Sequence, residues 1–176
     1  MHFRTASAAS CLIAFAAALC VPLSAYADDY GDVNQLMRSG KLAEALAKAD
    51  QYLAAKPRDP QMAFLKGVVL GEQGRTADAI AAFTKLTEDY PELPEPYNNL
   101  AVLYAGQSQF EKARAALESA VRVDPGYAVA YENLGDVYAR LAGQAWAKSQ
   151  QLDAANTSVA PKLALVRQLF AKPAVK

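Results

Sequence analysis

A repeat with a fixed period of 34 residues constrains the fold of this chain more than any other feature of its sequence. Three columns of proline or small residues share the period. They contain Pro57, Pro91 and Pro125; Ala45, Ala79 and Ala113; and Gly40, Gly74 and Ser108. Because three columns keep one spacing, coincidence is a poor explanation. A period of this length is typical of proteins in which one small unit is stacked several times.

Each column has a physical meaning for the local structure. A glycine or serine suits the reversal between two helical stretches, where the backbone needs a small and permissive residue. An alanine inside the second stretch allows a neighbouring helix to approach closely. A proline ends that stretch, because it lacks the backbone N–H and clashes with the preceding turn. Each unit is therefore predicted to be a helix hairpin whose apolar face only a neighbouring hairpin can cover.

The residues between these columns resemble the tetratricopeptide repeat, whose pattern is W-x2-L-G-x2-Y…A-x3-F…P. Landmarks of the pattern occur in three units: Gly67, Ala79, Phe83 and Pro91; Tyr97, Leu100, Ala101, Tyr104, Ala113, Leu117 and Pro125; and Tyr131, Leu134, Gly135 and Tyr138. The first unit keeps Gly40, Ala45 and Pro57 but has Asp32-Val33 in place of Leu-Gly. The resemblance implies an all-α, right-handed α-solenoid over residues 28–176. Its repeats would lie at approximately 28–59, 60–93, 94–127 and 128–153, with a capping helix at 157–171.

The fourth unit departs from the pattern. Its landmark Leu152-Asp153 comes five residues earlier than the spacing of the third unit requires. The segment that should hold the turn is rich in helix formers instead. We therefore expect one long helix from about Ala128 to Leu152, with Gly143 as the place for a bend.

A last helix is expected after this long one. Asn156-Thr157-Ser158 offers an N-cap, and apolar residues then recur at helical spacing, namely Val159, Leu163, Val166 and Phe170. This helix should lay its apolar face over the open end of the stack. Trp146 is expected to pack and help to hold it there, rather than to bind a ligand.

The proline-rich segment 91–96 has two interpretations. It could bind a proline-recognising domain. However, it falls where a repeat boundary is due, and proline fits the first turn of the helix that follows. We therefore interpret it as a boundary.

The N-terminal segment 1–27 has the pattern of a secretory signal peptide. Arg4 lies near its start, an apolar run occupies residues 8–23, and Ala25-Tyr26-Ala27 provides small residues for cleavage. The apolar run is short for a membrane span, although an uncleaved anchor is the alternative. We expect a periplasmic or secreted protein that is not inserted in the membrane after cleavage.

The residue types that remain after residue 27 exclude several chemistries. The two cysteines, Cys11 and Cys20, and the single His2 all lie in the segment expected to be removed. Disulfides, thiol chemistry and imidazole bases or ligands are then excluded. The net charge of the whole chain is zero, which does not favour nucleic-acid binding. Glu132 and Asp136 could hold a cation or assist proton transfer, but a solvated face is the commoner role of such a pair. We expect no cofactor, no metal and no enzyme activity.

The resemblance implies that the first helix of each pair lines a concave groove that binds a protein or peptide. The candidate binding residues are Asn34, Arg38, Phe64, Val68, Glu72, Asn98, Asn99, Val102, Glu132, Asn133, Asp136 and Arg140. Asparagine can pair with a peptide backbone, although this family often has asparagine there for structural reasons. Where a carboxylate-binding clamp would need lysines, this chain has Tyr30, Phe64, Glu95 and Val129. The far end of the groove is predicted to be acidic.

These features predict a non-catalytic adaptor or scaffold of the bacterial periplasm. Its partner is expected to be an extended or helical segment with an apolar anchor and some positive charge. The alternative is a structural subunit of a cell-envelope assembly or maturation complex. The motifs specify the fold far more closely than the partner.

Overall fold

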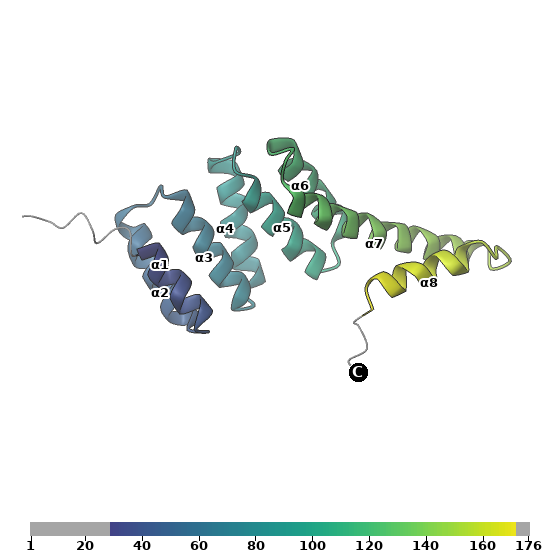
Figure 1. The fold of residues 1–176 in the computed structure, drawn as a ribbon, viewed down its shortest axis with the longest axis horizontal. Helices are drawn as coiled ribbons and strands as arrows, with labels where there is room; N and C mark the ends of the chain where they lie inside the picture. The colour runs from purple at the N-terminus through teal and green to yellow at the C-terminus, as the bar shows by residue number, and fades with distance from the viewer. Residues whose placement is uncertain (1–28, 172–176) are drawn as a thin grey trace, which may run out of the picture.

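The computed structural model describes residues 29–171, which form eight helices without a strand in that range. The predicted signal peptide lies outside the described residues. The helices are α1 (Asp29–Arg38), α2 (Leu42–Ala55), α3 (Pro60–Glu72), α4 (Thr76–Asp89), α5 (Pro94–Gly106), α6 (Phe110–Val123), α7 (Ala128–Leu152) and α8 (Val159–Leu169). Figure 1 shows them in a row in chain order, from α1 and α2 at one end to α7 and α8 at the other.

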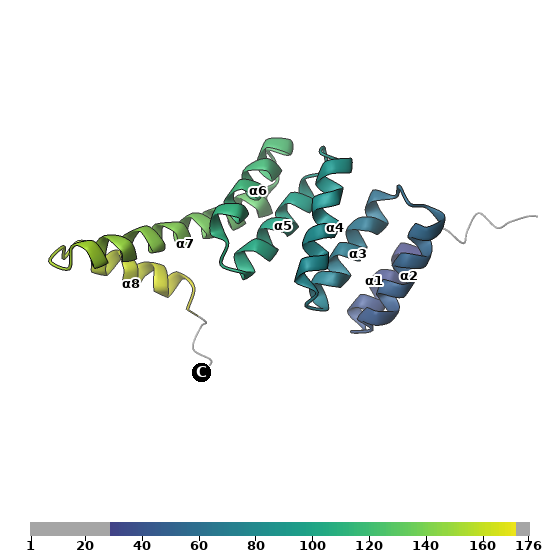
Figure 2. The ribbon, with the colours of Figure 1, turned by 180° about the vertical axis from the view of Figure 1, so that it is seen from behind.

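The array is built from hairpins. Helices α1 and α2, α3 and α4, and α5 and α6 form three pairs, and each helix also packs on the next one along the chain. The view from behind shows the same order (Figure 2). The prediction of an all-α solenoid with a terminal helix is therefore confirmed. Within residues 29–171, none of the helices combines the length and apolar character needed to cross a bilayer.

The predicted reversals occur at the glycine and serine column. Gly40, Gly74 and Ser108 have φ angles of +70°, +72° and +59°. In each turn, the backbone N–H of the following residue donates to a carbonyl of the preceding helix at 2.9–3.0 Å: Lys41 to Leu36, Arg75 to Leu70, and Gln109 to Tyr104. This bond satisfies a helix-end carbonyl and requires a left-handed residue at the turn. Glycine adopts that conformation without strain, whereas serine does not.

The alanine column lies where paired helices touch. Ala45, Ala79 and Ala113 are all 0% exposed. Around them, the apolar side chains form three clusters that run along the array. A larger residue at these points would push the helices apart, because interiors are close-packed.

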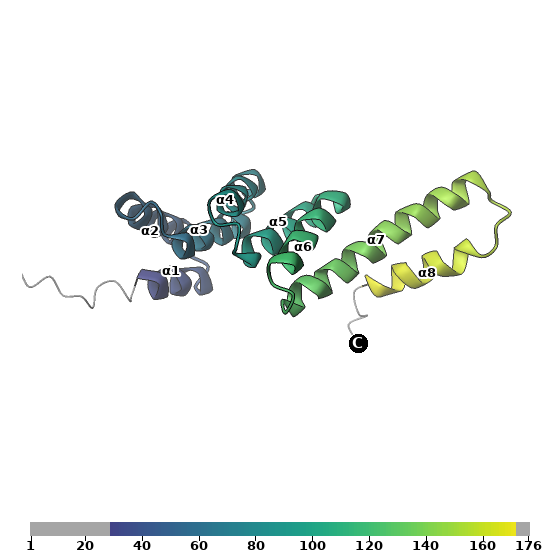
Figure 3. The same ribbon diagram turned by 90° about the horizontal axis from the view of Figure 1, so that it is seen from above.

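Helix α7 is a single continuous helix, as the shortened fourth unit predicted. Gly143, where a bend was expected, lies close to α8: a Cβ there would lie 3.2 Å from Val166. Figure 3 shows α8 running back alongside α7 at the end of the array. Val159 and Leu163 are buried in this contact, and the Lys162 ammonium lies 5.8 Å from the Trp146 ring. Helix α8 thus packs against one side of α7, around Arg140, Gly143 and Trp146.

The turn before α8 differs in detail from the expected N-cap. Ser158 occupies the N-cap position but its side chain makes no capping hydrogen bond. Instead, the Asn156 Oδ1 accepts from the Ser158 amide at 3.0 Å and from its hydroxyl at 2.7 Å. The polar residues therefore stabilise the turn rather than the helix end.

Ser108→Gly is expected to raise the free energy of unfolding by about 0.5–1 kcal/mol, because glycine removes the strain of a left-handed serine at the cost of some chain entropy. Urea unfolding followed by circular dichroism measures the change. Gly74→Ser is the matched control and should lower stability by a similar amount. An unchanged or lower stability of Ser108→Gly would show that the turn is not strained.

Gly67→Ala and Gly135→Ala should change stability in opposite directions. A Cβ at Gly67 would lie 2.7 Å from the Phe83 ring, whereas a Cβ at Gly135 meets no atom within 4 Å. Overpacking should cost Gly67→Ala about 1–3 kcal/mol. Helix propensity should give Gly135→Ala a gain of about 1 kcal/mol. Thermal unfolding of both variants tests the pair, and destabilisation by Gly135→Ala would contradict the open space at that position.

Candidate functional site

All of the predicted groove residues lie on α1, α3, α5 and α7, the first helices of the four units. Their exposure differs along the array. Arg38, Glu72 and the two acidic residues of α7 are exposed, whereas Phe64 and Val68 are partly buried. Val102 is 52% exposed. The groove side therefore has an apolar section on α3 and α5 and a charged section on α7.

A hollow of about 270 Å³ lies between the beginnings of α3 and α5. Its lining consists of Pro60, Gln61, Phe64, Leu93, Glu95 and Pro96. The Phe64 ring is held against Phe83, with ring centroids 5.5 Å apart and planes tilted by 58°. The walls are mostly apolar, with Gln61 and Glu95 supplying polar atoms at the rim. A hollow of this kind fits one apolar side chain with a polar or cationic neighbour.

Of the three apolar candidate residues, Phe64, Val68 and Val102, only Phe64 lines this hollow. Val68 packs beside the cluster that contains Leu70 and Phe83, and Val102 is exposed on α5. The sequence analysis did not identify Pro60, Leu93 and Pro96 as site residues, and it interpreted 91–96 as a repeat boundary. The signal that could have identified Pro60 and Pro96 is the presence of proline in the first turn of both α3 and α5, which places a rigid apolar ring near the beginning of each helix.

The part of the groove side formed by the start of α5 and by α7 is acidic. Glu95, Glu132 and Asp136 are exposed, and within residues 29–171 none of them forms an ion pair. Burial raises the pKa of the Tyr127 hydroxyl, and the charges of Glu95 and Asp124 raise it further. Three unpaired carboxylates make this end attractive to a cationic segment.

Arg140 is exposed, and its guanidinium already has a partner within the chain. Its guanidinium lies 3.6 Å from the centroid of the Phe170 ring, which follows α8. This cation–π contact turns the arginine toward the last helix. The positive charge of Arg140 therefore helps to attach α8.

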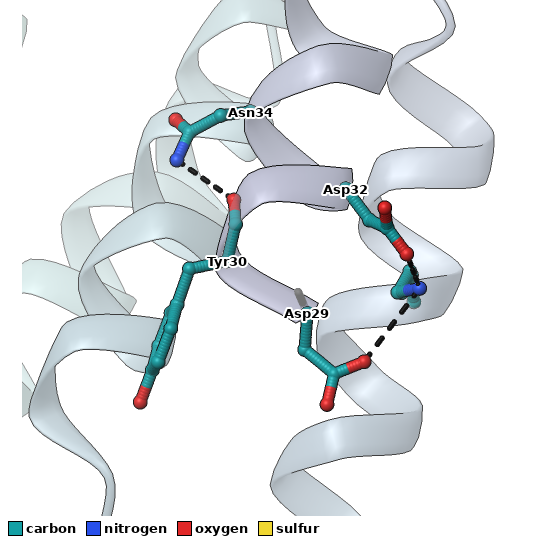
Figure 4. Close-up of polar contacts among 5 residues, drawn as sticks. Asp29, Tyr30, Asp32 and Asn34 are labelled. Atoms are coloured by element: carbon teal, nitrogen blue, oxygen red, sulfur yellow. Dashed lines mark hydrogen bonds and ion pairs between the residues drawn. The ribbon is translucent and has the colours of Figure 1, made fainter. Parts of the chain in front are cut away.

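The groove asparagines already have hydrogen-bond partners. Asn98 is 7% exposed, and its Oδ1 accepts from the Asn133 Nδ2 at 2.8 Å, which joins α5 to α7. The Asn99 side chain donates to the Glu95 carbonyl at 2.9 Å. Asn34 donates to the Tyr30 carbonyl at 2.8 Å (Figure 4). These contacts are structural, and pairing of the asparagines with a peptide stays a prediction.

Two family models described as tetratricopeptide repeat match the chain, one over residues 32–94 and the other over residues 70–134. The chain belongs to the tetratricopeptide repeat family. The matched ranges overlap and together cover the helices from α1 into α7. The resemblance of the sequence to the tetratricopeptide repeat is therefore confirmed.

Known tetratricopeptide repeat proteins are similar to parts of this chain. The TPR repeat-containing thioredoxin TTL4 of Arabidopsis thaliana is 33% identical over 113 residues, which are 64% of this chain but only 16% of that protein. A crystal structure of MamA has a TM-score of 0.58 at 20% identity, covering 77% of this chain and 82% of that one. The first TPR of Spaghetti (RPAP3), bound to the HSP90 peptide SRMEEVD, has a TM-score of 0.60 at 17% identity and covers 65% and 90%. The two structures share the fold of this chain.

The first tetratricopeptide repeat holds its groove-side tyrosine in a polar cluster. The Tyr30 hydroxyl donates to the Asp59 Oδ2 at 2.5 Å, and the Tyr52 hydroxyl donates to the same oxygen at 2.9 Å. The Asp59 Oδ1 accepts from the Met62 amide and caps α3. Burial alone would raise the pKa of the Asp59 carboxyl, yet the hydrogen bonds from Tyr30, Met62 and Tyr52 lower it. Burial and the bond to Asp59 raise the pKa of Tyr30.

Asp59→Asn is expected to lower the free energy of unfolding at neutral pH by about 1–2 kcal/mol, because hydrogen bonds to a charged acceptor are stronger. Since the pKa of Asp59 is lower in the folded state, its contribution is present above the unfolded value of about 3.9 and is lost as the pH falls through the folded value. Urea unfolding at a series of acidic pH values should show a smaller loss of stability in the variant than in the parent chain.

Urea unfolding at alkaline pH tests the contribution of Tyr30 to the same cluster. The pKa of Tyr30 is higher in the folded state, so its contribution is present below about pH 10 and is lost as the pH rises. Tyr30→Phe should flatten the alkaline profile only. Parallel profiles for all three proteins would show that the cluster does not couple folding to pH.

Proposed function

We propose that this protein is a non-catalytic adaptor that binds a peptide or protein segment on its groove side. The observation that carries the proposal is the apolar hollow at Phe64, whose lining includes the Glu95 carboxylate. An apolar side chain of the partner enters the hollow, and a lysine or arginine nearby faces Glu95. The fold is a scaffold for protein interaction rather than a set of catalytic groups.

The energies suit a reversible contact. Burying one apolar side chain contributes about 1.5–3 kcal/mol. The carboxylates contribute mainly to the rate of encounter and to the choice of partner. Several contacts along the groove are then needed for stable binding, and the exposed Val102 offers a further apolar surface on α5.

The charge of the groove selects a different peptide from the one bound by a relative of the same fold. The HSP90 peptide SRMEEVD in the Spaghetti complex carries three acidic residues. Here Glu95, Glu132 and Asp136 would repel such a sequence. A cationic segment with an apolar anchor is the complementary ligand.

We place this adaptor in the periplasm or outside the cell. Support comes from the N-terminal segment, with its apolar run followed by Ala25-Tyr26-Ala27. Removal of residues 1–27 would leave a chain without cysteine or histidine, which suits an oxidising compartment and a role without acid–base catalysis.

A second candidate is a structural subunit of a cell-envelope assembly. The observation that favours it is the exposure of three leucines on the last two helices, Leu152, Leu165 and Leu169. Such residues suit a surface that another subunit covers permanently. Purification distinguishes the candidates, because an adaptor should be a stable monomer alone whereas an obligate subunit should aggregate or unfold.

Screening the purified chain against immobilised random peptides should select sequences in which an apolar residue stands near lysine or arginine. Gln61→Trp should weaken binding of a selected peptide about tenfold, since the indole would fill the hollow without disturbing the contact between Phe64 and Phe83. Fluorescence anisotropy with the labelled peptide measures the change.

One variant is a control for this experiment, and a second tests the contribution of charge. Leu165→Ala removes an exposed apolar side chain from α8 and should leave the affinity unchanged. Glu95→Lys should weaken binding and reduce its dependence on salt. Equal affinity of Gln61→Trp and the parent chain would exclude the hollow as the binding site, even if peptides bind elsewhere.

A further inference from the structure

Helix α7 exposes an uncharged face formed by Tyr131, Gly135 and Tyr138. The three residues stand four and three positions apart, so they share one side of the helix. The two tyrosines are 50% and 47% exposed. A Cβ at Gly135 would meet no atom within 4 Å. We call these three residues the α7 docking face.

The equivalent face of the preceding repeat shows which kind of element packs on residues at these positions. The residues 34 positions earlier on α5 are Tyr97, Ala101 and Tyr104. Ala101 is 1% exposed, and both tyrosines pack against the cluster that includes Ala113 and Leu117 of α6. In the third repeat, this face of α5 is therefore covered by α6.

The second repeat uses the corresponding surface in the same way. Gly67 stands two periods before Gly135, and it is covered by the Phe83 ring of α4. In each of these repeats, the second helix of the hairpin lies on this face.

The fourth repeat lacks the helix that should cover it. One period after Ser108 the chain has Ala142, which lies inside α7 instead of at a reversal. The next helix, α8, packs on another side of α7, where Gly143 meets Val166 and Arg140 meets Phe170. The α7 docking face is left open by both neighbours.

We propose that the α7 docking face binds a helix of another protein, in the position that α6 takes against α5. The chemistry of that helix follows from α6. Ala113 lies against the α5 face with Leu117 one turn on, and the Lys112 ammonium lies 5.5 Å from the Tyr104 ring. The partner helix therefore has a small residue opposite Gly135, an apolar residue one turn later and a lysine or arginine over Tyr138.

The charges beside the α7 docking face favour this partner over a second copy of the chain. The Glu118 carboxylate accepts from the Tyr138 hydroxyl at 3.3 Å, but it also lies 3.8 Å from the Arg114 guanidinium, which offsets its charge. Glu132 is exposed on the flank and forms no ion pair within residues 29–171. Two copies of α7 meeting face to face would bring their Glu132 carboxylates together. The alanine faces of α2, α4 and α6 are already buried within the chain. A basic amphipathic helix from another protein is complementary to the acidic flank at Glu132.

A synthetic peptide with the sequence of residues 110–123 is the probe, since it copies α6. Titrated into the isotope-labelled full chain, it should shift NMR signals of α7. Gly135→Leu should weaken this binding at least tenfold without loss of helicity, because the new side chain enters open space in the free protein. The matched control is the same peptide with Ala113→Phe, which should not bind.

Absence of binding, or equal binding to the parent chain and Gly135→Leu, would overturn the proposal. Sedimentation showing a dimer of the chain that Gly135→Leu dissociates would also overturn it, in favour of a second copy. The variant Gln61→Trp should bind the probe normally. Failure of the α7 docking face is therefore distinguishable from failure of the hollow at Phe64.

Discussion

Close contact between paired helices is the constraint on which the rest of the structure depends. It occurs where Ala45, Ala79 and Ala113, all 0% exposed, meet the first helix of their own hairpin. Small side chains at these crossings let the larger apolar residues around them interdigitate. No hairpin could bury its apolar side alone, so this contact and the stacking of neighbours stabilise each other.

Both proposed binding surfaces follow from how that stacking is completed or interrupted. At the start of α5, the repeat boundary brings Leu93 and Pro96 to the same hollow as Phe64. At α7, the chain omits a reversal, and the surface around Gly135 that the earlier repeats fill is left open. One surface takes a side chain and the other takes a helix, so the two could be occupied independently.

Carboxylates without an ion pair determine the charge of the groove side. The carboxylates of Glu95, Glu132 and Asp136 have no cationic partner in residues 29–171, while Arg140 is held by Phe170. The groove side is therefore acidic on α5 and α7, and Glu132 extends this charge to the flank of the α7 docking face. Complementary cationic segments are the ligands that such a surface selects.

The sequence by itself determined the helix hairpins, their period and the single long helix at the fourth unit. These follow from local rules: Gly40 and Gly74 allow a left-handed turn between two helices, and Pro57, Pro91 and Pro125 prevent the preceding helix from continuing. The resemblance to the tetratricopeptide repeat placed the candidate groove residues on the first helix of each unit, and the structure has them on α1, α3, α5 and α7.

Only the tertiary structure decided what each of those side chains does. Asn98 faces Asn133 across two helices, Arg140 stacks on Phe170, and Pro96 rather than Val68 shares a hollow with Phe64. The partner in each case comes from another helix, and its distance depends on how the helices cross. The 34-residue period shows which positions are equivalent along the chain. It does not show which of these positions a neighbouring helix will cover.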